Sequence, residues 1–376
     1  MSRTALRGRA WVDGGIRDNV TIVLEDDLIA DVIVGDSIPA QSVGGLMVPG
    51  FIDLHVHGAR GSDFMDADPA AIQVVTAWHA QHGTTALCAT TLSAPPDTLL
   101  QAVRAIAGSE SSAGASEIIG IHLEGPYLSP GKCGAQDAAS LRPADFNELG
   151  ALLSQAPEKK WMMTVAPEVD GVLSLIELYK DRVLFSIGHS DAGYGEVIDA
   201  FERGAKHVTH LFNAMTPLQH RQPGAVGAAM VSIDTTAEII ADGVHVHPGV
   251  LRIARQLMPR RLALVTDAMR ACGMPDGVYK LFRHDVRVSE GAARLEDGTL
   301  AGSVLTMIGA VQNMVELAGV PLEEVLPLAT EVPAHIIGVS DRKGKLAAGY
   351  DADLLVINAR FEIERVFVRG TELEHP

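Results

Sequence analysis

LMVPGFIDLHVHG, residues 46–58, is the most informative segment of this sequence for the fold. It is an apolar run that ends with His55 and His57. Side chains alternate across a β-strand, so residues two apart leave the strand on the same face. Two neutral imidazole nitrogens held together suit Zn²⁺ or Fe²⁺. The segment therefore predicts a strand that presents a pair of metal-binding side chains at the mouth of a sheet.

Seven more apolar runs of strand length follow, and stretches with apolar residues at helical spacing lie between them, for example 69–83 and 247–259. Eight alternating β/α units predict an α/β protein with a (β/α)8, TIM-type barrel. The runs are nearly continuous in apolar residues, as strands buried on both faces should be. The expected strands, counted from the first run, are 46–55, 84–91, 117–124, 161–166, 183–189, 207–212, 237–245 and 262–267.

Side chains that can bind a metal recur where these runs end. They are His122, Glu124, His189, His207, His210, His245, His247 and Asp267. The active sites of TIM barrels lie at the carboxyl ends of the strands, so residues far apart in sequence can meet there. The pattern therefore predicts one site built from several strands.

The two ends of the chain carry alternating, strand-like segments. We expect residues 1–45 and 340–376 to pair as one small β-sandwich domain, and residues 46–339 to form the barrel. Residues 276–300 also contain strand and turn patterns, and would be inserted after the eighth barrel strand.

Composition narrows the functional classes. The chain of 376 residues has a formal net charge of −17, which argues against non-specific binding to nucleic acid or to an anionic membrane. No apolar stretch approaches the ~20 residues that a membrane-spanning helix needs, and no signal-peptide pattern opens the chain. Cys88, Cys133 and Cys272 are few, odd in number and far apart. They predict no disulfide framework and favour a cytoplasmic location.

Several motifs together resemble the amidohydrolase superfamily and, within it, the family of N-acetylglucosamine-6-phosphate deacetylases, over essentially the whole chain. These motifs are PGFIDLHVHG, HLEGPYLSP, VAPE, GHSDA, THLFNAMTPLQHRQPG, DGVHV, LVTDAM, DGTLAGSVLTM and GKLAAGYDADLLV. The resemblance implies metal-dependent hydrolysis of the acetamide of N-acetylglucosamine 6-phosphate. The products would be glucosamine 6-phosphate and acetate, in amino-sugar catabolism and cell-wall recycling.

The resemblance also implies the roles of the residues at the strand ends. The implied ligands of the main metal ion are Glu124, His189 and His210. His55 and His57, with Asp267 and a bridging Glu124, would complete a second position, so the site would hold one or two ions, with zinc favoured over iron. Asp267 would be the catalytic acid and base, because amide hydrolysis needs a group that takes a proton from water and returns it to the amine.

The phosphorylated substrate needs a site for its anion. Arg221 is the best cationic candidate, because a guanidinium binds phosphate through two hydrogen bonds. The resemblance adds the main-chain amides of Asn213 and Ala214, together with His245, and it suggests that Arg221 enters from the neighbouring subunit of a homodimer. Three further residues are candidates for contact with the substrate: Ala135, Gln136 and Met307. Gln136 stands where some relatives have a histidine that polarises the substrate carbonyl.

Other functions remain open at this point. The nearest alternatives are a deacetylase of N-acetylgalactosamine 6-phosphate, which differs in one hydroxyl group, and another metal-dependent amidohydrolase such as a dihydroorotase. The second is disfavoured because Glu124, rather than a lysine, would bridge the ions. A metal-binding scaffold without activity would be expected to lack the acid and base, and Asp267 is present.

Overall fold

The computed structural model describes residues 3–109 and 114–374. Residues 1–2 and 375–376, at the two ends of the expected small domain, lie outside the described residues. Within the described ranges, no helix is long and apolar enough to cross a membrane.

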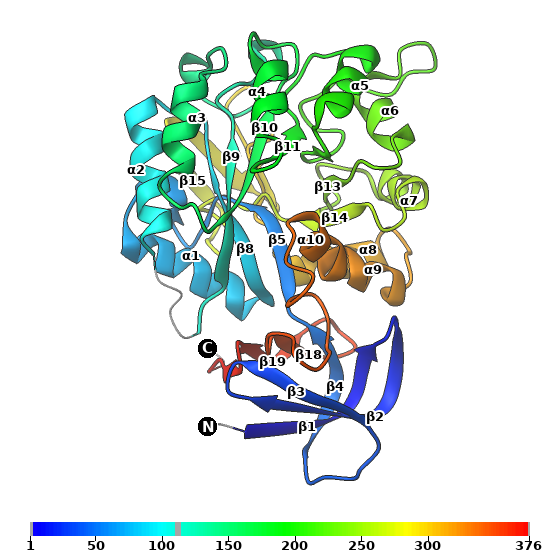
Figure 1. Ribbon diagram of the computed structural model, residues 1–376. Helices are drawn as coiled ribbons and strands as arrows, with labels where there is room; N and C mark the ends of the chain where they lie inside the picture. The colour runs from blue at the N-terminus through cyan, green and yellow to red at the C-terminus, as the bar shows by residue number, and fades with distance from the viewer. Residues whose placement is uncertain (1–2, 110–113, 375–376) are drawn as a thin grey trace.

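Parallel strands form the centre of the molecule, with helices around them (Figure 1). Six strands pair in chain order, and two more form a separate parallel pair. Main-chain hydrogen bonds link the two groups, from Leu211 to Glu238 (2.8 Å) and from Asp267 to His55 (2.8 Å). The predicted TIM-type class of the main domain is therefore confirmed. The strands are β5 (Phe51–Val56), β8 (Thr84–Thr91), β9 (Glu117–Glu124), β10 (Lys160–Val165), β11 (Leu184–Ile187), β12 (His207–Val208), β13 (Ala237–Ile240) and β14 (Leu262–Val265).

The surrounding helices each bury one apolar face. In α2, for example, Leu99, Val103 and Ile106 are fully buried, as the helical spacing of apolar residues requires. Asp68 and Asp145 cap the first turns of α1 and α3, which stabilises these ends. The α-helices are α1 (Pro69–Gln81), α2 (Pro96–Ala107), α3 (Phe146–Leu153), α4 (Val172–Tyr179), α5 (Tyr194–Arg203), α6 (Gly224–Val231), α7 (Pro248–Leu257), α8 (Met307–Glu316), α9 (Leu322–Ala329) and α10 (Glu331–Ile336).

The first expected strand, 46–55, is two strands in the structure. The chain breaks at Gly50 between β4 (Gln41–Pro49), in the terminal sheet, and β5, in the barrel. A Cβ atom at Gly50 would lie 2.1 Å from Oγ1 of Thr85, so only glycine fits where the chain passes from one sheet to the other. The expectation of one strand is corrected accordingly, and β4 crosses the boundary at residue 45 that the sequence suggested.

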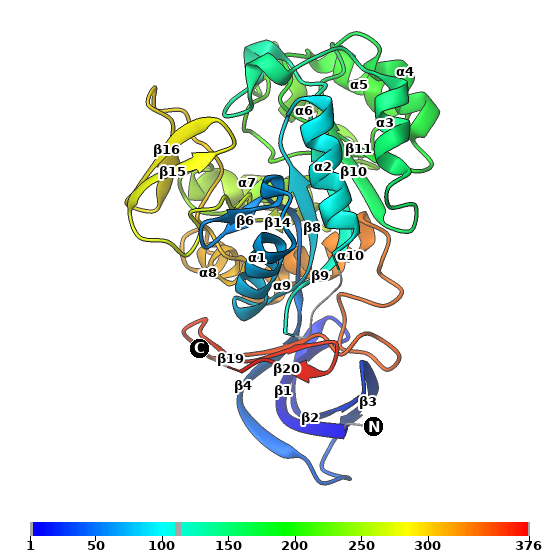
Figure 2. The same ribbon diagram turned by 90° about the vertical axis from the view of Figure 1, so that its left-hand side faces the viewer.

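Both ends of the chain contribute to one seven-stranded sheet, of order β20-β19-β18-β4-β1-β2-β3. Figures 1 and 2 show this sheet below the barrel, with both termini beside it. It encloses its own apolar core, which includes Leu6, Ile22, Met47 and Leu354. The remaining strands of this sheet are β1 (Arg3–Val12), β2 (Gly15–Glu25), β3 (Leu28–Val34), β18 (Leu354–Ile357), β19 (Ile363–Val368) and β20 (Thr371–Glu372).

A small antiparallel sheet follows the last barrel strand, where strand and turn patterns were expected. It consists of β15 (Gly277–Leu281), β16 (His284–Ser289) and β17 (Ala292–Arg294), and Figure 2 shows β15 and β16 to one side of the barrel. A short hairpin, β6 (Gly58–Ala59) and β7 (Ser62–Asp63), follows β5.

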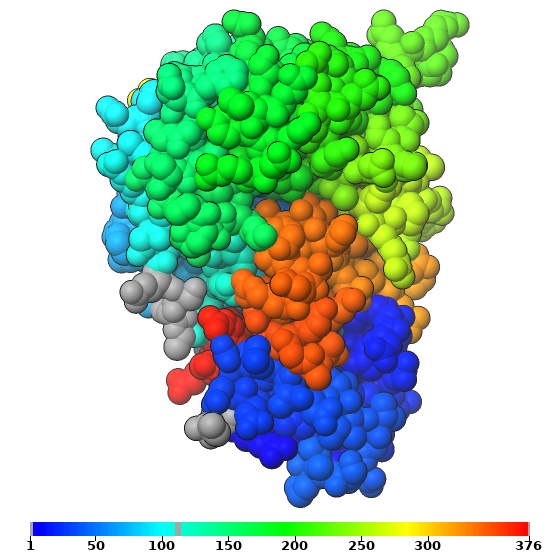
Figure 3. Space-filling model, viewed as in Figure 1, coloured from blue at the N-terminus to red at the C-terminus, as the bar shows by residue number. Residues whose placement is uncertain are grey.

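An ionic cluster lies between the barrel and the terminal sheet. Lys343 is only 2% exposed, and its ammonium group contacts three carboxylates, those of Glu117 (2.9 Å), Asp351 (2.8 Å) and Asp353 (2.6 Å). Arg342 adds a second contact to Glu117, at 2.7 Å. Figure 3 shows α10 and the chain that follows it, in orange, covering this junction. Because Glu117 opens barrel strand β9, the cluster ties the two parts of the molecule together.

Candidate metal and catalytic site

Three of the expected metal ligands meet at the carboxyl ends of the barrel strands. Glu124 is the last residue of β9, and His189 and His210 follow β11 and β12. Oε1 of Glu124 lies 3.0 Å from Nε2 of His189 and 3.2 Å from Nε2 of His210, and the two Nε2 atoms are 3.1 Å apart. All three side chains are buried.

A second group of possible ligands adjoins the first. The Nε2 atoms of His55 and His57 lie 3.2 Å apart, and Nε2 of His57 lies 3.2 Å from Oδ1 of Asp267. Glu124 reaches this group as well, because its Oε2 lies 3.3 Å from Nε2 of His57. The carboxylate of Glu124 thus contacts both groups, as expected for a residue that bridges two metal positions.

The donor atoms fit divalent metal ions. Ligand atoms bound tetrahedrally at ~2.1 Å lie roughly 3.4 Å from one another, close to the separations in both groups. Two Nε2 atoms that face each other at 3.1 Å, as those of His189 and His210 do, share at most one proton. A cation between the nitrogens would satisfy both lone pairs. Among the described residues, Nδ1 of His57 and Nδ1 of His210 have no hydrogen-bond partner. This is consistent with rings whose orientation depends on the contacts of Nε2.

The main chain is left-handed at three of these positions. The φ angles are 47° at His189, 31° at His210 and 49° at Asp267. Residues other than glycine rarely adopt positive φ, although histidine and aspartate do so more often than most. At each position the strand has just ended, and the turn points the side chain across the barrel mouth. Such strain is typical of functional sites.

The electrostatics of the site favour ionised carboxylates. Burial alone would raise the pKa of Glu124, but the charge of His55 and hydrogen bonds from His189 and His210 hold it well below its ordinary value. Burial would also raise the pKa of Asp267, yet the neighbouring His55 and His57 lower it. Both carboxylates can therefore bind a cation or accept a proton.

The loop after β9 holds the ligands from one side. Nε2 of Gln136 donates to Oε2 of Glu124 (2.5 Å), and Oε1 of Gln136 accepts from the main-chain N–H of Ser93 (2.7 Å). The carbonyl oxygen of Lys132 accepts from Nδ1 of His189 (2.8 Å), which leaves Nε2 of that ring as the metal-binding nitrogen. The side chain of Gln136 therefore positions Glu124.

A cavity of about 460 Å³ opens above these groups. Its walls contain ten of the residues expected from sequence: His57, Glu124, Ala135, Gln136, His189, His210, Asn213, Ala214, His245 and Asp267. His55 is fully buried beneath them. The volume is sufficient for a small polar ligand such as a sugar phosphate.

Two expected substrate contacts lie elsewhere. Met307 is fully buried in the hydrophobic core at the start of α8, because this helix packs its first turn against the barrel. Arg221 is exposed and does not line the cavity of its own chain. In addition, the main-chain N–H of Asn213 donates to the carbonyl oxygen of His210 (2.9 Å). This amide is therefore already paired within its turn.

Lys132 and Arg294 line the cavity and were not foreseen. Lys132 lies two residues after the HLEGPYLSP motif, at the end of a short 3-10 helix (Pro130–Lys132), and Arg294 ends β17, in the inserted sheet. No local pattern shows that either would reach the barrel mouth. Asp242 was also missed, although it is the first residue of the DGVHV motif; its Oδ2 accepts from Nδ1 of His245 (2.6 Å) and so leaves the other ring nitrogen for the cavity.

The GSVLTM motif supports the end of the eighth barrel strand. The main-chain N–H of Ser303 donates to the carbonyl oxygen of Asp267 (2.7 Å), and the hydroxyl of Ser303 donates to the carbonyl oxygen of Thr266 (2.6 Å). A Cβ atom at Gly302 would lie 3.0 Å from the carbonyl oxygen of Asp267. The GSVLTM motif thus helps to hold the main chain at Asp267, the expected acid and base.

Parallel strands with histidines and an aspartate at their carboxyl ends define a metal-dependent hydrolase, and comparison with known proteins agrees. The amidohydrolase family matches residues 46–373, and the chain belongs to that family. It is 38% identical over 338 residues to the N-acetylglucosamine-6-phosphate deacetylase of Bacillus subtilis, an alignment that covers 88% of this chain and 85% of the relative. The resemblance to these deacetylases, indicated by the motifs, is thereby confirmed.

Two further relatives are informative. The N-acetylgalactosamine-6-phosphate deacetylase of Escherichia coli O157:H7 is 34% identical over 367 residues, with 96% of this chain and 97% of the relative covered. A mutant of the N-acetyl-D-glucosamine-6-phosphate deacetylase of Mycobacterium smegmatis, solved in complex with N-acetyl-D-glucosamine-6-phosphate, superposes with a TM-score of 0.93. It is 34% identical, and 99% of each chain is covered.

Proposed function

We propose that this protein is a metal-dependent deacetylase that hydrolyses the acetamide of N-acetylglucosamine 6-phosphate to glucosamine 6-phosphate and acetate. The observation that carries the proposal is the convergence of Glu124, His189, His210 and Asp267 at one cavity, in a chain similar throughout to enzymes of that name. The reaction belongs to amino-sugar catabolism and cell-wall recycling.

Asp267 is the group that moves protons in this mechanism. A divalent ion held by these residues would supply an acidified water and polarise the substrate carbonyl. The carboxylate of Asp267 takes a proton from the attacking water and delivers it to the amine nitrogen as the carbon–nitrogen bond breaks. Its lowered pKa keeps it ready to accept that proton. Gln136, which lines the cavity, can donate a hydrogen bond to the carbonyl but no charge.

Glu124, His189 and His210 would hold the main ion, and His55 and His57 would hold a second with Asp267 and Glu124. Two imidazoles and a carboxylate at nearly tetrahedral spacing favour zinc, and iron is the next candidate. Occupancy is thus one or two ions per subunit.

The phosphate site is proposed to form between two subunits of a homodimer. Ala214 and His245 line the cavity, and Arg221 would reach it from the partner. Apolar side chains are exposed on both sides of the Arg221 loop, with Leu218, Val231 and Ile233 at 54%, 59% and 78%. Figure 3 shows the chain before α6 projecting from the body. A projecting loop flanked by exposed apolar side chains suits an interface between identical subunits.

Two broader features belong to the same proposal. The terminal sheet would fold over its own core as a β-sandwich, since Leu6, Ile22, Met47 and Leu354 form one enclosed cluster. The protein would work in the cytoplasm, because its three cysteines are free.

A deacetylase of N-acetylgalactosamine 6-phosphate is the second candidate, because a relative of that name is 34% identical over 96% of the chain. The two sugars differ at one hydroxyl group, and discrimination depends on a polar contact to it.

The test is acetate release by the purified protein from N-acetylglucosamine 6-phosphate, the galactosamine isomer and unphosphorylated N-acetylglucosamine. We expect kcat/KM to be highest for the first. A preference for the isomer would establish the second candidate. No acetate from either phosphorylated sugar, with metal bound, would refute both.

A further inference from the structure

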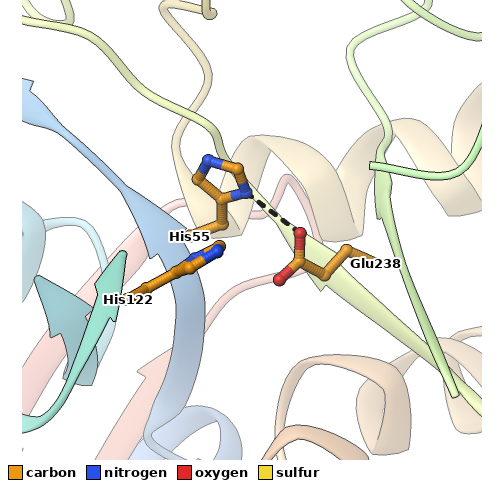
Figure 4. Close-up of side chains that lie close together, drawn as sticks. All are labelled: His55, His122 and Glu238. Atoms are coloured by element: carbon orange, nitrogen blue, oxygen red, sulfur yellow. Dashed lines mark hydrogen bonds and ion pairs between the residues drawn. The ribbon is translucent and has the colours of Figure 1, made fainter. Parts of the chain in front are cut away.

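A glutamate that the proposed mechanism does not use lies in the barrel interior beneath the metal site. Glu238 belongs to strand β13, and none of its side chain is exposed. Its Oε2 accepts a hydrogen bond from Nδ1 of His55 at 3.0 Å, and Figure 4 shows the carboxylate directed at that ring. An ionised carboxylate in an apolar interior is costly unless its oxygens are paired, so this position requires an explanation.

The same oxygen of Glu238 also contacts His210, an expected ligand of the main metal ion. Oε2 of Glu238 accepts the main-chain N–H of His210 at 3.2 Å, just where that residue adopts its positive φ. Oε1 lies 3.5 Å from Nε2 of His207. One carboxylate beneath the site therefore contacts the ring of one expected metal ligand and the main chain of another.

We infer that Glu238 is a positioning residue that prepares both metal positions. Its hydrogen bond to His55 places the proton on Nδ1, which leaves Nε2 with a free lone pair facing His57 and Glu124. Its bond to the N–H of His210 holds the turn that brings the imidazole of that residue to Glu124. The inference rests on the proposed metal-dependent function and extends it to a strand that provides no expected ligand.

The alternative is that His55, His122 and Glu238 bind a further ion, since their donor atoms lie within 4.8 Å of one another. Both nitrogens of His122 already have partners: Nε2 lies 2.7 Å from the hydroxyl of Thr164, and Nδ1 lies 3.2 Å from the carbonyl oxygen of Leu54. The ring stands edge to face with that of His55, at 4.6 Å between centroids (Figure 4). These contacts indicate that His122 and Glu238 support the ring of His55 through packing and hydrogen bonds, and do not themselves bind an ion.

Two substitutions separate position from charge. Glu238→Asp keeps the charge but is shorter by one methylene, so it should no longer reach His55. Glu238→Gln keeps the length and an acceptor oxygen for His55, while its amide group can donate to Nε2 of His207, which lacks a hydrogen-bond partner. The aspartate variant should hold metal 10- to 100-fold less tightly, about the effect of removing a partner of a metal-bound histidine. The glutamine variant should lose less than that.

The measurement is metal content rather than activity. The metal-loaded full chain is dialysed against graded concentrations of a chelator, and the zinc retained per subunit is measured by atomic absorption. Asp353→Asn is the control. Asp353 is also a buried carboxylate, but it contacts the ammonium group of Lys343 (2.6 Å) and accepts from the main-chain N–H of Arg369 (2.9 Å), at the junction with the terminal sheet rather than beneath the metal site. This control should retain zinc as the wild type does, even if its melting temperature falls.

Three results would overturn the inference. Wild-type retention in both variants would show that the contact does not matter. Loss in Glu238→Gln with retention in Glu238→Asp would mean that charge acts instead of position. A third ion per subunit, lost in both variants, would establish the alternative metal site. If the wild type itself bound no divalent ion, the proposed function would fall, which is a different outcome from a failure of the Glu238 variants alone.

Discussion

Replacing Glu117 by glutamine should weaken the junction between the barrel and the terminal sheet in a pH-dependent way. Burial alone would raise the pKa of Glu117, but hydrogen bonds and charges from Arg342 and Lys343 lower it from 4.5 to about 2. A carboxylate whose pKa is lower in the folded state stabilises the fold above its unfolded pKa. That contribution is lost as the pH falls toward the folded pKa.

The size of the effect follows from that shift. A pKa lowered from 4.5 to about 2 corresponds to about 3 kcal/mol of unfolding free energy at pH 7, because each pKa unit is about 1.4 kcal/mol. At pH 3 the unfolded carboxyl is already protonated while the folded one is still largely ionised, so about 1.4 kcal/mol remains. The side chain of Glu117 is 15% exposed, so solvent screens the pair only partly.

Urea unfolding of the wild type and Glu117→Gln at pH 7, 4 and 3 measures this difference. Asp18→Asn is the control, because Asp18 faces Arg9 at 3.4 Å in a surface pair with an 89% exposed carboxylate. Such pairs are worth about 1 kcal/mol at most. An equal loss at pH 7 and pH 3 in Glu117→Gln would mean that packing, not charge, holds the junction. No loss at pH 7 would refute the reasoning altogether.

The remaining predictions concern the site. Asp267→Asn should lower kcat by about a hundredfold or more with little change in KM, measured by acetate release; near-normal turnover would assign the proton transfer to another group, with His245 the first to test. Replacing both His55 and His57 by alanine should remove at most one ion per subunit in metal analysis, since Glu124, His189 and His210 remain, and loss of all metal would contradict the two-position arrangement. Arg221→Ala should lower kcat/KM for the phosphorylated sugar and leave the unphosphorylated sugar nearly unaffected, and dimers mixed from Asp267→Asn and Arg221→Ala subunits should regain activity. Verified mixed dimers without activity would place Arg221 in the site of its own subunit.

The barrel strands and the ligand cluster could be predicted from sequence because each has a local pattern. The ends of β9 and β14 illustrate this, since an apolar run stops at a residue that can bind a metal or move a proton, Glu124 or Asp267. The break at Gly50 had no such pattern. The apolar residues continue through it, and only the approach of Thr85 requires the glycine.

The walls of the cavity were harder to foresee, because they depend on contacts between distant segments. Arg294 reaches the cavity only because the inserted sheet folds back toward the barrel mouth. Glu238 lies in a predicted strand, and its neighbours in sequence are apolar on both sides. Its partners, His55 and the main chain of His210, lie on other strands, so no spacing within its own segment marks it.

The terminal sheet also bears on how the chain is made. Strand β4 pairs with β1 on one side and with β18 on the other, so during synthesis β1 to β4 are made some three hundred residues before β18, which completes their sheet. At about 5–20 residues per second, that interval lasts roughly 15–60 s. During it, Met47 and Ile22 lack the cover that Leu354 gives in the finished core. We expect nascent chains halted before β18 to present this unfinished sheet to chaperones, whereas the completed chain hides it.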